Sequence, residues 1–325
     1  MKIKRCWLLT PVLAGNLFAG WEPIPPLPEP NGGFACGVVD EKIIVIGGTN
    51  WKDETKHWLA GIWVFDTKTQ KWEVHGKLPH SLAYAAVAEW KGDFIIAGGT
   101  TGTQPRREVW RMDRSLKLMR IGELKEDAVL AAGGLAGNDL FLVGGCAEPS
   151  KITGFYGRGV KLNLERDSVS TFQPPGNVAF ALAASVVVGR EWFVFGGVTT
   201  NSVTEIANLN AAWAFDAARN KWRELRPLPI AVRGAAAVRL DSHRILIAGG
   251  YGGQPEGFTA AAFIYDTKRD AYAKTMDLPI GALLGVVRAG DYVYALGGED
   301  RGKHRVDACF RVKVAELLKA AKATR

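Results

Sequence analysis

The feature that most constrains this chain is a pair of glycines that recurs six times, each time at the end of a β-branched or aromatic run. The runs read IIVIGG, FIIAGG, LFLVGG, WFVFGG, ILIAGG and VYALGG, and their first glycines are Gly47, Gly98, Gly144, Gly196, Gly249 and Gly297. Successive spacings are 51, 46, 52, 53 and 48 residues. A period of about 50 residues indicates a repeat protein in which each repeat is one small β unit. Glycines are expected at such strand ends because the chain turns sharply there and a side chain would crowd its neighbours.

Each repeat carries further strand signals after its glycine pair. An apolar run usually ends in Asp or Asn, and an aromatic residue then stands six residues before a Leu-Pro, at Trp72, Trp222 and Tyr272. The repeat is therefore expected to form four short strands, with the aromatic residue on the outermost strand and packed between neighbouring units. Units of this kind and period are typical of kelch repeats. The predicted fold class is all-β, a six-bladed kelch-type β-propeller.

The two ends of the chain are expected to complete one of these units together. After Gly298 the sequence supplies one more strand, VDACFRVKV, and then an Ala/Lys-rich tail without an outer aromatic strand. Trp21, however, stands six residues before Leu27-Pro28. We therefore predict that residues 21–28 supply the outer strand of the last blade and close the ring, which removes exposed sheet edges. The propeller is expected to span residues 21–314, followed by a C-terminal tail over residues 315–325.

The first 20 residues have the composition of a secretory signal peptide. A basic start from Lys2 to Arg5 precedes a mostly apolar stretch, residues 6–18, and the small pair Ala19-Gly20 follows. We therefore predict a signal peptide at residues 1–20 and a periplasmic or secreted protein. The alternative is an N-terminal arm, disordered or packed at the edge of the fold. No later apolar stretch is long enough to span a bilayer, so the mature chain is not expected to insert into a membrane.

Charge and histidine spacing narrow the classes of partner. The net charge of +8 is spread along the chain, and no run of five or more Lys or Arg occurs. This argues against nucleic acid as a partner and leaves an anionic small molecule open. The histidines show no metal-ligand spacing, and the chain contains no P-loop or Rossmann fingerprint, so neither a metal nor another cofactor is expected. They are His57, His75, His80, His243 and His304.

Function is expected at one mouth of the propeller, where the loops after the glycine pairs meet the loops before the innermost strands. Only the last repeat places opposite charges at a fixed spacing directly after its glycine pair, in GGEDRGKHRVDACF. Glu299 leaves the turn and Arg305 enters the next strand, so the loop can bring the two side chains together. A carboxylate in a partly desolvated mouth is a candidate general base, and an arginine can bind a ligand carboxylate bidentately. The alternative is a structural salt bridge at the rim.

This segment resembles the N-acetylneuraminate epimerases, and more closely the cyclically permuted mutarotase family of kelch-repeat propellers. Their catalytic pattern, G-E-x5-R-x-D-A-x-F, is met by Gly298-Glu299, Arg305, Asp307-Ala308 and Phe310. The segment PNGGFACG and Asn210 are also similar to the family. The resemblance implies a cofactor-free mutarotase that interconverts the α and β anomers of N-acetylneuraminate or a related sugar acid. Glu299 and Arg305 would be its catalytic residues.

The same mouth is expected to contact the sugar acid through a further set of side chains. These are Arg233, Tyr84, Trp51, Asn50 and Phe34. Two positions depart from the family pattern, because Leu82 stands where an arginine is expected and Ala211 where an aspartate is expected. The alternative function is a non-catalytic kelch propeller that binds a glycan or a protein partner at this mouth. The sequence leaves the oligomeric state open.

Overall fold

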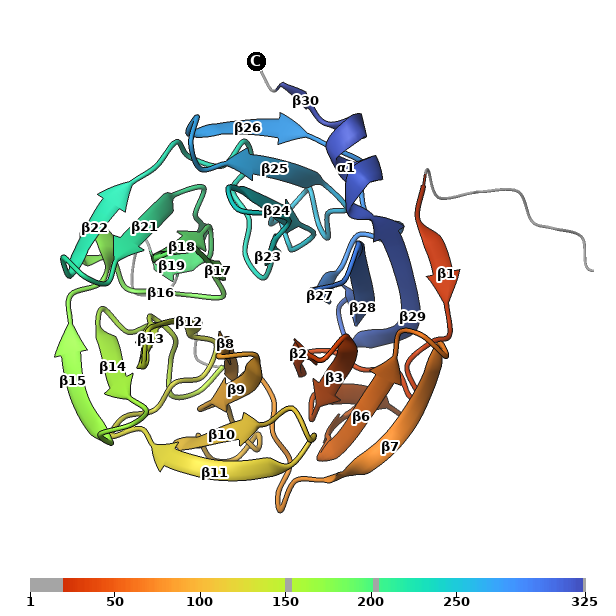
Figure 1. Cartoon of the computed structure of the whole chain (residues 1–325), viewed down its shortest axis with the longest axis horizontal. Coiled ribbons are helices and arrows are strands. Elements are labelled where there is room, and N and C mark those ends of the chain that lie inside the picture. Colours follow the sequence, from red (N-terminus) through yellow and green to blue (C-terminus); the bar gives the residue numbers. More distant parts are fainter. Residues whose placement is uncertain (1–19, 150–153, 201–204, 324–325) are drawn as a thin grey trace, which may run out of the picture.

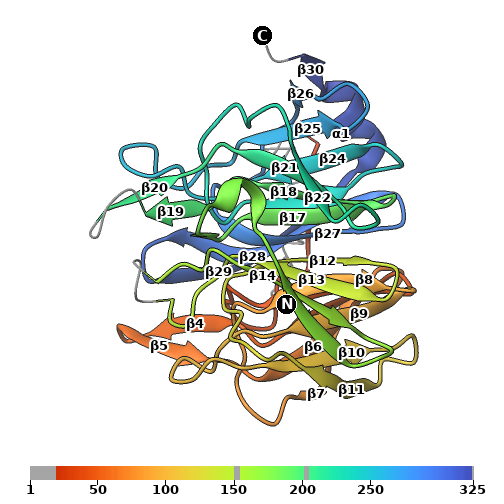
Figure 2. The same ribbon diagram turned by 90° about the vertical axis from the view of Figure 1, so that its left-hand side faces the viewer.

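A computed structural model of the chain describes residues 20–149, 154–200 and 205–323. The predicted signal peptide, residues 1–20, lies outside these ranges except for Gly20. Within them the chain is all-β apart from one short α-helix and one 3-10 turn, and its strands form antiparallel sheets, most of them four-stranded. Figure 1 shows the sheets arranged around a common centre, and Figure 2 shows the same assembly from its side. No helix in these ranges is long and apolar enough to cross a membrane.

Six sheets follow one another along the chain, and each begins with the strand that lies nearest the centre in Figure 1. Sheet 1 consists of β2 (Ala35–Val39), β3 (Lys42–Ile46), β6 (Gly61–Asp66) and β7 (Lys71–Lys77). Sheet 2 consists of β8 (Ala86–Trp90), β9 (Asp93–Ala97), β10 (Glu108–Met112) and β11 (Leu118–Glu123). Sheet 3 consists of β12 (Ala132–Ala136), β13 (Asp139–Val143), β14 (Gly159–Asn163) and β15 (Ser168–Phe172).

The second half of the chain repeats this order with two additions from the chain ends. Sheet 4 consists of β17 (Ala184–Val188), β18 (Glu191–Phe195), β21 (Ala212–Asp216) and β22 (Lys221–Glu224). Sheet 5 consists of β23 (Ala236–Arg239), β24 (Arg244–Ala248), β25 (Ala262–Asp266), β26 (Ala271–Lys274) and β30 (Lys322–Ala323). Sheet 6 consists of β27 (Leu283–Ala289), β28 (Tyr292–Arg301), β29 (His304–Lys313) and β1 (Glu22–Ile24).

Smaller elements lie in the connections between these strands. A hairpin is formed by β4 (Thr49–Lys52) and β5 (Thr55–Trp58), and a three-stranded sheet by β16 (Phe180–Ala181), β19 (Val198–Thr200) and β20 (Ile206–Asn208). The 3-10 turn η1 spans Pro175–Asn177, and the helix α1 spans Val314–Ala320.

The N-terminal segment pairs with the last sheet, as the sequence predicts. In β1, Glu22 lies opposite Arg311 of β29 and Ile24 lies opposite Cys309. The strand is shorter than the predicted segment 21–28, because Pro25 and Pro26 have no backbone N–H to donate to a ladder. As an edge strand, β1 tolerates a proline of its own at position 23.

The glycine pairs connect each sheet to the next one. The N–H of the second glycine donates to a carbonyl in the loop that leads into the next sheet, from Gly48 to Leu82 through to Gly298 and Asn31, at 2.7 to 2.9 Å. A Cβ on the first glycine of any pair would lie only 2.0 to 2.8 Å from that same carbonyl oxygen. The backbone there also has positive φ, for example +66° at Gly47. Glycine is therefore required because the neighbouring sheet occupies the space of a side chain.

The outer aromatic residues also bind neighbouring sheets, which confirms the predicted packing. The indole N–H of Trp72 donates to the Pro25 carbonyl (3.0 Å), and that of Trp222 donates to the Gln173 carbonyl (2.9 Å). The hydroxyl of Tyr272 donates to the Arg226 carbonyl (3.0 Å). Each contact leaves an outer strand and reaches the chain that follows the outer strand of the adjacent sheet. A polar tip on an apolar ring suits this position, because the ring packs between sheets while the tip satisfies a carbonyl.

The C-terminal tail, whose structure the sequence leaves open, packs on the outside of sheet 5. Leu317 of α1 is fully buried in a cluster with strands of sheets 5 and 6. The hydroxyl of Thr275 donates to the Leu317 carbonyl (2.6 Å), and β30 pairs with β26. The tail therefore joins the last two sheets at their outer rim.

Candidate functional site

A cavity of about 280 Å³ opens where the loops after the glycine pairs meet the loops before the innermost strands. Its lining includes Phe34, Tyr84, Glu299 and Arg305, together with small and apolar residues from all six sheets. Four of the predicted site residues thus line one cavity. Asn50, Trp51 and Arg233 are not among the lining residues. In the described ranges, no group of three or more His, Cys, Asp or Glu is placed to hold a metal ion.

Sheet 6 brings the two predicted catalytic side chains together through an extended hairpin. Strand β28 continues beyond its glycine pair to Arg301, and β29 begins at His304, directly opposite. Glu299 also lies opposite Leu283 at the start of β27. The loop predicted between Glu299 and Arg305 is therefore mostly strand, with a turn at Gly302-Lys303.

Glu299 and Arg305 form an ion pair of 3.0 Å between Oε2 and Nη1. The Arg305 side chain is only 3% exposed, whereas that of Glu299 is 27% exposed. The guanidinium is held from two further directions, because its Nε donates to the Thr49 hydroxyl (3.3 Å) and Nη1 to the His304 carbonyl (3.4 Å). Thr49 donates in turn to the Gly32 carbonyl (3.1 Å). The site therefore combines a fixed, buried cation with a carboxylate that still reaches the cavity.

Two residues that contact Arg305, Thr49 and Gly32, are distant from Glu299 and Arg305 in the sequence. Thr49 follows the first glycine pair just as Glu299 follows the last one, so its position could have been found by aligning the repeats. Gly32 leaves room for the arginine, since a Cβ there would lie 2.5 Å from Arg305 Cδ and 2.7 Å from its Nε. No sequence signal indicates this second role, because the contact exists only where sheet 6 meets the start of sheet 1.

Tyr84 faces the cavity beside an aromatic cluster on the β4–β5 hairpin. Its hydroxyl accepts a hydrogen bond from the Lys56 ammonium (2.7 Å), and its ring meets Trp58 edge to face, with centroids 5.8 Å apart. The Lys56 ammonium also lies 4.7 Å from the centroid of a Trp58 ring. Lys56 itself is not among the lining residues of the cavity, so its contact is with the Tyr84 hydroxyl that borders it.

Asn50 and Trp51 belong to β4, outside the cavity. The Asn50 amide donates to Glu29 Oε2 (3.2 Å). Burial raises the pKa of the Glu29 carboxyl, an effect that nearby Lys77 opposes. The Trp51 ring lies 5.7 Å from the Lys303 ammonium, and its indole N–H is buried without a hydrogen-bond partner in the described part of the chain.

Arg233 forms a separate cluster on the loop before sheet 5. Its Nη1 donates to Asn208 Oδ1 (2.9 Å), and its guanidinium carbon lies 4.4 Å from the centroid of the Tyr251 ring. Burial lowers the pKa of Arg233, partly opposed by Tyr251. The two positions that depart from the family pattern carry uncharged residues. Leu82 is buried, and Ala211 packs against an apolar cluster.

Comparison with known proteins identifies the repeat. Residues 30–75 match the family model of the Kelch motif. The chain is 26% identical over 251 residues to the Kelch-like protein terF of Aspergillus terreus, covering 72% of this chain and 53% of that protein. It is 24% identical over 278 residues to Kelch-like protein 35 of Mus musculus, covering 83% and 44%. Against the N-acetylneuraminate epimerase of Brucella suis it is 31% identical over 104 residues, covering 25% and 26%. The chain thus spans about half, or less, of the length of these relatives.

Proposed function

We propose that the six sheets of this kelch-repeat chain are the blades of a closed propeller with an active site at one mouth. Closure is supported by three contacts between the last sheet and the start of the chain. Strand β1 pairs with β29, the Gly298 N–H donates to the Asn31 carbonyl (2.7 Å), and β27 contacts β2. A closed ring leaves no innermost strand without neighbours on both sides.

The proposed activity is cofactor-free interconversion of the α and β anomers of N-acetylneuraminate or a related sugar acid. The observation that carries it is the pairing of a buried arginine, Arg305, with the partly exposed Glu299 at the wall of a cavity. The cavity volume of about 280 Å³ is close to the lower end of small-molecule sites, which suits one sugar unit better than a long glycan. The partial match to an N-acetylneuraminate epimerase supports the same class of substrate.

The proposed mechanism needs only proton transfers. The Glu299 carboxylate accepts the proton of the anomeric hydroxyl while the bond between the anomeric carbon and the ring oxygen breaks. The O–H electron pair forms the new carbonyl, and the ring oxygen keeps the electron pair of the broken bond and takes up a proton from a water molecule. Rotation of the carbonyl followed by reclosure on its other face returns both protons and inverts the anomeric centre. Arg305 would hold the ligand carboxylate or stabilise negative charge that develops on the ring oxygen.

Proton NMR of freshly released α-N-acetylneuraminate tests this proposal. We expect the protein to accelerate equilibration with the β anomer, and we expect Glu299→Gln to abolish the acceleration. Glu54→Gln is the matched control, because Glu54 is an exposed carboxylate on the same side of the fold that pairs with Lys303. Equilibration at the buffer rate with unmodified protein would refute the mutarotase proposal.

A second candidate is non-catalytic binding of a glycan or a protein partner at the same mouth. It is favoured by the relatives themselves, since the two Kelch-like proteins match 72% and 83% of this chain and the epimerase matches 25%. Under this alternative Glu299→Gln weakens binding of the partner and no rate is lost. Acceleration of anomer exchange that depends on Glu299 would exclude it.

We also propose that the protein is exported, on the basis of the predicted signal peptide at residues 1–20. The expected location is the periplasm or the medium. Expression with its native N-terminus, followed by fractionation and N-terminal sequencing, tests this. An intact N-terminus on a cytoplasmic protein would contradict it.

A further inference from the structure

A second cavity, of about 590 Å³, lies along the same central axis. It is lined by later residues of the innermost strands, whereas the cavity beside Glu299 is lined by the residues that lead into those strands. The two cavities share six lining residues, which are Cys36, Val87, Gly133, Ser185, Ala237 and Val286. They are therefore the two ends of one channel, and the second end contains none of the predicted catalytic residues.

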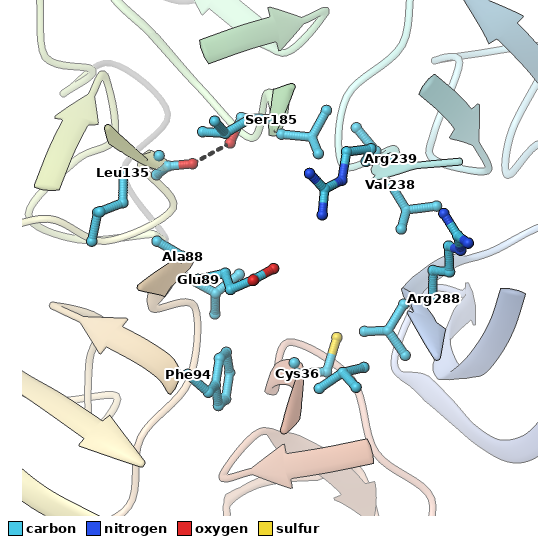
Figure 3. Close-up of a pocket in the computed structure, with 18 of the residues that line it drawn as sticks. Cys36, Ala88, Glu89, Phe94, Leu135, Ser185, Val238, Arg239 and Arg288 are labelled. Carbon is cyan, nitrogen blue, oxygen red and sulfur yellow. Dashed lines mark hydrogen bonds between the residues drawn. The ribbon is translucent and has the colours of Figure 1, made fainter. Parts of the chain in front are cut away.

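Three charged side chains, Glu89, Arg239 and Arg288, line this second end of the channel. Figure 3 shows Glu89 and Arg239 extending into the cavity toward each other, while Arg288 lies at its edge with its guanidinium turned outward. Arg239 belongs to β23 and Arg288 to β27, and these two innermost strands contact each other. The Arg239 guanidinium thus faces the Glu89 carboxylate, and a second guanidinium, from the neighbouring sheet, lies at the side of the cavity.

Neither arginine is neutralised by an acidic side chain. The Arg288 guanidinium donates to two backbone carbonyls, through Nε to Gly290 (3.0 Å) and through Nη1 to Leu240. Arg239 makes no hydrogen bond or ion pair in the described part of the chain. The other carboxylate of the lining, Asp93, is bound by Arg111 Nε at 2.6 Å and is not available to either arginine.

The rest of the lining suits a small organic ligand. It consists largely of glycine, alanine and valine, and the volume lies within the range of small-molecule sites. The Ser185 hydroxyl donates to the Gly133 carbonyl (2.8 Å), which leaves its oxygen as an acceptor in the lining. Burial raises the pKa of the Cys36 thiol to about 12, which keeps this group neutral where the two cavities meet.

We propose that this end of the channel is a second binding site, for a small organic anion whose carboxylate or phosphate lies between Arg239 and Arg288 and whose hydroxyl or ammonium group donates to Glu89. Arginine is suited to such groups because its planar donors match the oxygens of carboxylates and phosphates. The proposal does not depend on the activity proposed for Glu299 and Arg305.

Isothermal titration calorimetry with glycerol 3-phosphate, glycerate, inorganic phosphate and neutral glycerol tests the site. We expect saturable binding of one anion per chain and no binding of glycerol. Glycerol 3-phosphate and glycerate distinguish a phosphate ligand from a carboxylate ligand. Arg239→Gln should weaken binding about tenfold, since one of two charged contacts is lost. Glu89→Gln should strengthen binding of inorganic phosphate, because the nearby negative charge is removed.

Two matched variants make the result decisive. Arg269→Gln removes an arginine that is exposed on the outside of sheet 5, and we expect no change in affinity. Glu299→Gln alters the opposite end of the channel and should also leave this affinity unchanged. Because Arg239 has no hydrogen-bond or ion-pair partner among the described residues, its variant should melt at the temperature of the unmodified protein. Anion binding that is absent, or that survives in Arg239→Gln and is lost in Glu299→Gln, would overturn the proposal.

Discussion

Sheet 6 differs from the other five sheets in the chain that directly follows the glycine pair. In the first five, the second strand ends before its glycine pair, and the chain beyond the pair meets the loop that leads into the innermost strand through only one or two bridged pairs, such as Thr49 with Gly32. In sheet 6, β28 continues through its glycine pair as far as Arg301. Sheet 6 therefore differs from the other sheets at the position of the buried ion pair.

The backbone around the mouth shows the same contrast. In each of the first five sheets, one residue of the loop before the innermost strand has positive φ. In sheets 2 to 5, the N–H of this residue donates to the carbonyl of the corresponding residue in the preceding sheet. These residues are Gly33, Tyr84, Leu130, Leu182 and Gly234. The corresponding residue of sheet 6, Leu283, pairs instead with Glu299. A local departure from a repeat is the kind of place where function is expected, because the repeat alone already satisfies the fold.

The largest effect expected from this contrast is on activity. Arg305→Lys keeps a positive charge but loses the planar donors that contact Thr49 and the His304 carbonyl. We expect the rate of anomer exchange, measured by NMR, to fall by about 10²-fold or more. Cys146→Ala is the control in sheet 3, since Cys146 follows its glycine pair as Glu299 does, and it should retain full activity. Equal losses in both variants would remove the distinction between sheet 6 and the rest.

A second comparison uses the glycine pairs themselves. A Cβ at Gly98 would lie 2.4 Å from the Ala128 carbonyl oxygen, whereas one at Gly297 would first meet the flexible side chain of Leu27 at 2.6 Å. We therefore expect Gly98→Ala to lower the free energy of unfolding by about 3 kcal/mol, and Gly297→Ala to lower it less. Urea denaturation measures both. A larger loss at Gly297 would show that the junction with sheet 1 is the more rigid one.

Gly32→Ala tests whether sheet 1 positions the arginine of sheet 6. The added methyl group would displace the Arg305 side chain, whose Cδ would otherwise lie 2.5 Å away. We expect about a tenfold loss of activity, because displacement of a catalytic group reduces the rate steeply. Gly302→Ala, at a position with open space around its Cβ, is the control. Unchanged activity in Gly32→Ala would mean that the buried position of Arg305 does not matter.

The smallest expected effect concerns a charged pair with a purely structural role. In sheet 2, burial would raise the pKa of Glu108, but its hydrogen bond with Arg106 and the charges of Arg106 and His80 hold that pKa at about 2. A depressed pKa contributes stability above the ordinary pKa of a carboxyl group, and this contribution is lost as the pH falls toward 2. Glu108→Gln should therefore cost about 1 kcal/mol at pH 7, less near pH 2, and leave activity unchanged. Thermal melting at both pH values measures this difference.

The sequence predicts the repeating part of the molecule well. The period of the glycine pairs and the spacing of Trp72 from its Leu-Pro indicate four-stranded units, and Trp21 indicates the strand that joins sheet 6. The convergence of Glu299 and Arg305 also follows from their spacing within one hairpin. These features are local, so each can be recognised within a short segment.

Contacts between sheets are harder to predict. Thr49 and Gly32 reach Arg305 only because the first sheet lies next to the last one, and no local pattern encodes that distance. Asn50 and Trp51 follow a glycine pair as predicted, but the β4–β5 hairpin places them outside the cavity. Arg239 and Arg288 lie at or next to the ends of their strands, where the sequence alone indicates solvated residues and not that they line the same cavity.

The bonds that join the glycine pairs to the next sheet run from main chain to main chain, so they place no demand on the side chains at either end of the channel. Ligand preference can therefore change through a few substitutions beside the cavities while the hydrogen bonds between the sheets are retained. Overall sequence identity between such proteins then reflects the shared fold and says little about the ligand. A change at Glu299, Arg305 or Arg239 would be far more informative about a relative's ligand than dozens of differences in the strands.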